Sequence, residues 1–192
     1  MSIKDEKAST AEKVEPNKES KTLLDYFALA VTTFGVGYLP LAPGTWGSMV
    51  GVAIYLFFVW IEASASVKLG NWSELQITAW IHSFNAVLFV AFCLLGIWAS
   101  GHSTKLFKHK DPSQAVVDEV IGQLLTFLFI PFTYSWKMIL AGFLLFRLFD
   151  IWKPYPIDSL QNLPTGIGVC ADDILAGVYA GICLSIIYAL SF

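Results

Sequence analysis

The chain contains a single arginine, Arg147, and this residue lies within the apolar segment Phe146–Pro154. Asp150 and Lys153 follow it at steps of three residues, so the three side chains share one face of a helix. A guanidinium in hydrocarbon is costly unless it has a partner or a function. The pattern therefore favours an anion site beside a carboxylate. The alternative is an Arg147–Asp150 pair that neutralises itself, although Lys153 would leave this face positively charged.

Two pairs of adjacent acids, Asp118 with Glu119 and Asp172 with Asp173, directly precede apolar runs. The start of a helix explains one acid in each pair, because a carboxylate there caps the helix or complements its dipole, and Asp172 is a candidate N-cap. The second acid requires another explanation. We favour a role as a metal ligand.

With Asp150, these pairs predict a cluster of five metal-binding carboxylates: Asp118, Glu119, Asp150, Asp172 and Asp173. Clustered carboxylates repel one another unless a cation or protons lie among them. Ligand sets made only of oxygen select a hard ion, Mg²⁺ first. Mg²⁺ beside Arg147 and Lys153 suits the handling of phosphate. The three histidines and three cysteines show no metal-binding pattern, and we expect them to be structural.

A Gly- and Pro-rich segment, residues 35–48, precedes the first long apolar run. Free backbone N–H groups in such a loop can hold phosphate oxygens, and we expect Gly44, Thr45 and Ser48 to bind substrate. The alternative is a simple helix break with an N-cap. The segment is not a P-loop, because no lysine follows its last glycine.

The composition is that of a membrane protein: 56% of the 192 residues are hydrophobic, 14% are charged, and the mean hydropathy is +0.62. We expect one membrane domain over residues 23–192. Residues 1–22 hold five lysines and five acids, which predicts a disordered cytoplasmic tail that is not a signal peptide. The chain has no basic patch with interleaved aromatic residues, so we expect no nucleic-acid partner.

Uncharged runs predict an all-α, polytopic membrane bundle with four to five spans. A short helix over 23–34 is broken from the first span by the Gly- and Pro-rich loop 35–46. The predicted spans are 47–61, 82–100, 120–136, 138–152 and 174–192.

Lysines in the short loop 101–111 place that loop in the cytoplasm by the positive-inside rule. Counting spans from there puts the other Gly-, Pro- or acid-rich segments on the same side: 35–46, 111–119 and 152–173. The sequence therefore predicts one site at the cytoplasmic face of the membrane.

Four segments, taken together, resemble the phosphatidylglycerophosphatase A family of bacterial membrane lipid phosphatases: Phe34–Ser48, Val117–Gly122, Phe146–Ile157 and Gly166–Gly177. The resemblance covers about Leu23 to Phe192. It implies Mg²⁺-dependent removal of the terminal phosphate of phosphatidylglycerophosphate at the inner membrane, with no obligate protein partner. It also implies functional roles for seven residues: Asp118, Glu119, Arg147, Asp150, Lys153, Asp172 and Asp173. The chain departs from the family in its longer, more acidic tail and in lacking a second glycine before Gly166.

The expected mechanism is metal-assisted hydrolysis, in which Arg147 clamps the phosphoryl oxygens and Lys153 adds a point charge. Asp150 or Asp173 would orient the attacking water. The alternative mechanism, in which an aspartate attacks and forms a phosphoenzyme, also stays open. A Cys-x5-Arg phosphatase is excluded, because Ala141 occupies the position of the cysteine.

Two other classes remain as rivals. A cation or proton transporter would also carry intramembrane charges and a broken helix, but these acids gather at one face and no internal repeat is visible. A purely structural membrane subunit leaves the doubled acids unexplained.

Overall fold

A computed structural model describes residues 21–40, 42–68, 72–107, 112–161 and 163–191. All regular elements in these ranges are helices, which confirms the predicted all-α class. They are α1 (Leu23–Thr33), the 3₁₀ turn η1 (Val36–Tyr38), α2 (Pro43–Lys68), α3 (Glu74–Phe107), α4 (Val117–Phe127), α5 (Trp136–Trp152), α6 (Ile157–Leu160) and α7 (Thr165–Ala189). Within the part of the chain that the structure describes, three helices are long and apolar enough to cross a membrane, over Pro43–Ser64, Leu75–Phe107 and Gly166–Ala189.

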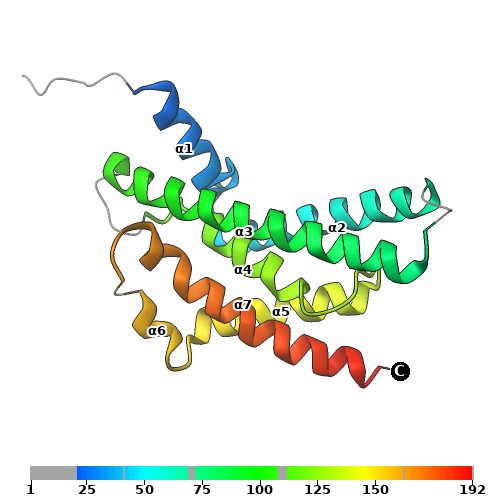
Figure 1. Ribbon diagram of the computed structural model, residues 1–192. Helices are drawn as coiled ribbons and strands as arrows, with labels where there is room; N and C mark the ends of the chain where they lie inside the picture. Colours follow the sequence, from blue (N-terminus) through cyan, green and yellow to red (C-terminus); the bar gives the residue numbers. More distant parts are fainter. Residues whose placement is uncertain (1–20, 41, 69–71, 108–111, 162, 192) are drawn as a thin grey trace, which may run out of the picture.

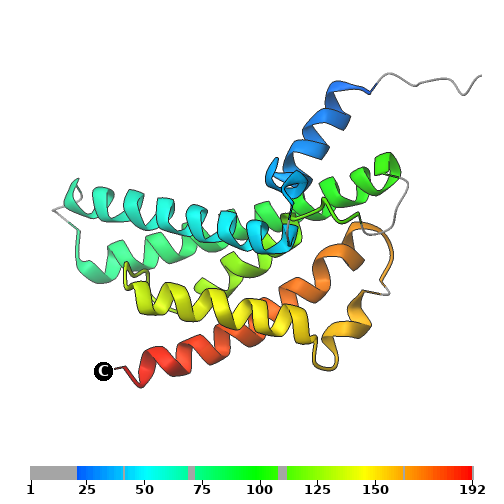
Figure 2. The ribbon, with the colours of Figure 1, turned by 180° about the vertical axis from the view of Figure 1, so that it is seen from behind.

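The short helix α4 lies inside the bundle, where it packs against α2, α3, α5 and α7 (Figures 1 and 2). It is buried through apolar residues such as Val120 and Ile121, and also through the polar residues Gln123 and Thr126. The helix α1 projects from one end of the bundle, and the C-terminus lies at the opposite end (Figure 1). Because α4 is enclosed, the acids of its first turn are held at a buried junction of helices.

All five helices that correspond to the predicted spans begin earlier than the uncharged runs predict, and two of these differences affect the site. The helix α2 begins at Pro43, since proline is well suited to the first turn of a helix, where its missing N–H has no partner to lose. Gly44 and Thr45 therefore belong to a helix and not to the predicted loop 35–46, and Ser48 lies further along the same helix. The helix α7 begins at Thr165, so the prediction that Asp172 is an N-cap is wrong.

The helix α4 ends at Phe127, well before the predicted end of the span 120–136. Pro131 follows closely, and proline disfavours helical geometry in the residue before it. The predicted disordered tail falls almost wholly on residues 1–20, which lie outside the described residues. Two lysines used for the orientation, Lys108 and Lys110, also lie outside them.

The helices α4 and α7 approach each other closely at Gly122 and Gly177. A Cβ atom on Gly177 would lie 2.5 Å from the carbonyl oxygen of Gly122 and 3.1 Å from its Cα. We expect Gly177→Ala to lower the free energy of unfolding by about 1–3 kcal/mol, because backbone and not a flexible side chain blocks the methyl group. Thermal unfolding in detergent measures this effect. Ser185→Ala, further along the same helix, is the control and should unfold like the wild type.

Candidate active site

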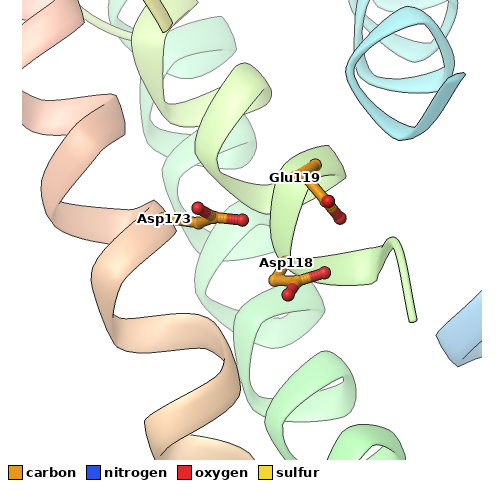
Figure 3. A group of neighbouring side chains, drawn as sticks. All are labelled: Asp118, Glu119 and Asp173. Atoms are coloured by element: carbon orange, nitrogen blue, oxygen red, sulfur yellow. The ribbon is translucent and has the colours of Figure 1, made fainter. Parts of the chain in front are cut away.

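Three carboxylates meet between α4 and α7: Asp118 and Glu119 from the first turn of α4, and Asp173 from α7 (Figure 3). One oxygen from each side chain lies within 4.8 Å of the other two. Asp118 is 8% exposed and Asp173 is 3% exposed. Figure 3 shows the Asp173 carboxylate reaching from α7 towards α4. The predicted acidic cluster therefore exists around these three residues.

The three carboxylates repel one another in a buried position. Burial raises the pKa of Glu119 well above its ordinary value, and the neighbouring charges of Asp118 and Asp150 raise it further. The Oε2 atom of Glu119 is buried and accepts no hydrogen bond from the described residues. A buried carboxylate oxygen in this state is suited to bind a proton or a cation.

The other two predicted metal ligands, Asp150 and Asp172, form ion pairs with basic side chains. Arg147 donates from Nη1 to Oδ2 of Asp150 over 2.5 Å, and Lys153 donates from Nζ to Oδ2 of Asp172 over 2.6 Å. Burial alone would lower the pKa of Lys153, but the charges of Asp172, Asp173 and Asp150 raise it above its usual value. Lys153 therefore stays a full cation beside the cluster.

The end of α5 directs Lys153 towards α7. Lys153 adopts a left-handed conformation with φ 45°, and its backbone N–H donates to the carbonyl oxygen of Phe149 over 2.9 Å. Pro154 then prevents the helix from continuing. A left-handed lysine is strained relative to glycine, and such strain is concentrated at functional positions.

The start of α2 covers the other side of the cluster. Gly44 faces the side chains of Glu119 and Arg147. Ser48 is fully buried, donates from Oγ to the carbonyl oxygen of Gly44 over 2.9 Å, and lies 3.5 Å from Nη1 of Arg147. Ser48 thus contacts the arginine, and the predicted binding of substrate by Gly44, Thr45 and Ser48 stays a prediction.

A cavity of about 380 Å³ opens beside the carboxylates. It is lined by residues from three of the predicted segments: Pro112, Ser113, Ala115, Asp118, Glu119, Asp150, Lys153, Gln161, Gly168, Val169, Asp172 and Asp173. The predicted convergence of these segments is therefore correct. Gln161 was not identified from the sequence, because it lies after α6 in a stretch with no motif.

Gly166, at the start of the fourth segment, has a packing role. A Cβ atom there would collide with the backbone of Ile97 and Gly101 in α3. This glycine lets α7 approach α3.

We expect Gly44→Ala to reduce activity by about 10²-fold, because a small displacement of catalytic groups has an effect of this size. The new Cβ would collide with Oε1 of Glu119 and lie 3.0 Å from Nη1 of Arg147. Stability should change little, since alanine favours the helix more than glycine does. Initial rates and thermal unfolding measure the two effects. The control is Ser64→Ala on the same helix, and a Gly44→Ala variant as active as this control would contradict the assignment.

Residues 29–188 match the family model described as Phosphatidylglycerophosphatase A. A protein of Bacteroides thetaiotaomicron named "Putative phosphatidylinositol-3-phosphatase" is 35% identical over 81% of this chain and 89% of its own length. Two proteins named phosphatidylglycerophosphatase A are also similar. The Haemophilus influenzae protein is 33% identical over 89% of this chain and 92% of its own length, and the Escherichia coli protein is 31% identical over 78% and 76%.

No solved structure matches this chain. The family model covers most of the chain, and it includes both bases and all five acids of the site. The chain therefore belongs to the phosphatidylglycerophosphatase A family, and it is a phosphatase.

Proposed function

We propose that this protein is a Mg²⁺-dependent lipid phosphatase that hydrolyses phosphatidylglycerophosphate to phosphatidylglycerol and inorganic phosphate, the last step of phosphatidylglycerol biosynthesis. The observation that carries the proposal is the group of Asp118, Glu119 and Asp173 beside two bases. The names of the relatives from Haemophilus influenzae and Escherichia coli support the choice of substrate.

The residues of the cluster fit a magnesium ion. Their ligand atoms are all carboxylate oxygens, which hard divalent cations prefer. The buried Oε2 of Glu119, which accepts no hydrogen bond from the described residues, provides a ready ligand atom. Asp118, Glu119 and Asp173 would hold the ion. A bound Mg²⁺ supplies positive charge that neutralises the phosphoryl oxygens as the phosphate ester is broken.

The two bases bind the phosphate group in this proposal. Arg147 offers two N–H donors to two phosphoryl oxygens, and Lys153 adds a point charge. Asp150 and Asp172 hold these bases in place before the substrate binds. Either Asp150 or Asp173 orients the attacking water, and direct attack by an aspartate remains the alternative route.

We further propose that α5 crosses the membrane together with the three long apolar helices. Its 17 residues reach the lower limit for a span, and α4 then lies buried among four spans. Lys105 lies in the last turn of α3, at the end of the bundle that carries the site. By the positive-inside rule this end faces the cytoplasm, and the membrane is the bacterial inner membrane. The acyl chains of the substrate stay in the bilayer while its phosphate reaches the cavity.

Phosphate release by purified protein in detergent tests the function. The substrates are phosphatidylglycerophosphate and phosphatidylinositol 3-phosphate, each with Mg²⁺ or with a chelator. We expect Mg²⁺-dependent release from phosphatidylglycerophosphate, at a clearly higher kcat/KM than from the inositol lipid. Preference for the inositol lipid would instead assign this chain the activity named for the Bacteroides relative. Equal rates with Mg²⁺ and chelator would refute the metal dependence.

A further inference from the structure

Gln123 is a fully buried polar residue on α4, one helical turn after Glu119. Neither Oε1 nor Nε2 of its side chain has a hydrogen-bond partner among the described residues. Buried polar groups nearly always have a partner, and an unpaired amide lowers stability. None of the roles proposed above uses this side chain. A buried amide in this state indicates a bound water or a task in the neighbouring site.

Two glycines of α2 pack against Glu119 and Gln123. A Cβ atom on Gly47 would lie 3.2 Å from Cβ of Glu119, and a Cβ atom on Gly51 would lie 2.8 Å from Cβ of Gln123. Gly47 and Gly51 are one turn apart on α2, as Glu119 and Gln123 are on α4. The glycines therefore let α2 cover both side chains together. Gln123 cannot turn out to solvent, and it lies on the same helix face as Glu119.

We propose that Gln123 is a positioning residue, whose amide holds Glu119 in the orientation that binds the metal ion by donating from Nε2, through one buried water, to Oε2 of Glu119. This inference rests on the proposed function. We place a water between the two side chains because they form no direct hydrogen bond, and a buried water needs two to four polar partners. Oε1 and Nε2 of Gln123 and Oε2 of Glu119 are three buried atoms available for it. Partners of this kind orient metal ligands and tune the affinity for the ion.

Gln123→Met tests the proposal, because methionine has a similar length and no amide. We expect the Mg²⁺ concentration for half-maximal activity to rise by at least about tenfold, while kcat at saturating Mg²⁺ changes much less. The Tm without metal should change little, since methionine fills a similar buried volume. The increase in Tm that Mn²⁺ alone produces should shrink at a fixed Mn²⁺ concentration.

Thr126→Val is the matched control on the same helix. Thr126 is fully buried, but its Oγ1 already donates to the carbonyl oxygen of Gly122 over 2.9 Å. Losing that bond should lower Tm and leave the half-maximal Mg²⁺ concentration unchanged. A Gln123→Met variant with wild-type Mg²⁺ dependence and a wild-type Mn²⁺-induced Tm increase would overturn the proposal.

The metal-binding readout keeps this proposal separate from the proposed function. If the wild type released no phosphate from either lipid while Mn²⁺ still raised its Tm, the proposed function would fail. The Mn²⁺-induced Tm increase would then decide the role of Gln123. A reduced increase in Gln123→Met would support it, and an unchanged increase would refute it.

Discussion

Replacing Asp173 by asparagine is expected to abolish phosphatase activity and, at the same time, to stabilise the metal-free protein. The substitution removes one of three carboxylates whose oxygens lie within 4.8 Å of one another. Loss of a metal ligand should reduce kcat/KM by at least about 10²-fold, because the charge on the phosphoryl group is no longer neutralised. Without metal, relief of repulsion worth about 1 kcal/mol should raise Tm by roughly 2–4 °C.

Two measurements check this pair of effects: initial rates of phosphate release with saturating Mg²⁺, and Tm in the presence of chelator. Asp158→Asn is the matched control, since Asp158 is an exposed aspartate on α6 and lies outside the cavity. It should keep both the activity and the Tm of the wild type. An Asp173→Asn protein that is inactive but also less stable without metal would show that Asp173 holds the fold together, and the metal-site assignment would then lose its support.

The second large effect is expected for Arg147→Lys, in which the positive charge is kept and the planar donor group is lost. Lysine cannot donate two parallel hydrogen bonds to a phosphate group, nor can it reproduce the contacts of Arg147 with Asp150 and Ser48. We expect kcat to fall by about 10²-fold, the size of effect seen when one preorganised donor is removed. Arg147→Ala should lose at least as much.

Steady-state kinetics separate this effect from a loss of charge alone. If Arg147 acts mainly as a point charge, Arg147→Lys will retain most of kcat and only Arg147→Ala will be strongly impaired. That outcome would contradict the bidentate role. Lys137→Ala, at the start of α5 and at the opposite end of that helix, is the control for removal of a base and should retain full activity.

The sequence predicted which segments meet in the site but not how their acids divide. Asp172 and Asp173 were both expected in the metal cluster. Adjacent residues of a helix point about 100° apart, so the two side chains face different neighbours once α7 begins at Thr165. Asp172 pairs with Lys153, and Asp173 reaches the acids of α4. If the helix had been predicted to begin before both acids, helix geometry would have separated their side chains. The uncharged run begins only after Asp173, so the predicted span started at residue 174.

The helix ends were also difficult to predict, for a physical reason. The length of an uncharged run shows how much of the chain can lie in the hydrocarbon of the membrane. The length of a helix depends instead on how far its backbone hydrogen bonds continue. The helix α3 therefore extends to Phe107, past the predicted end of the span at residue 100, and it carries Lys105. The four-residue spacing of Gly47 and Gly51 predicts a close approach between helices, but only the packed structure shows that these glycines face Glu119 and Gln123.

The three clustered carboxylates come from α4 and from α7, the last helix among the described residues. During synthesis, every element from α1 to α6 therefore leaves the ribosome before Asp173 can join Asp118 and Glu119. On the proposed site, a nascent chain without α7 holds only two of the three clustered carboxylates, so we expect it to release no phosphate. On the proposed site, hydrolysis requires α7 to pack against α4 through Gly122 and Gly177. Activity would then report that α7 has assembled with α4.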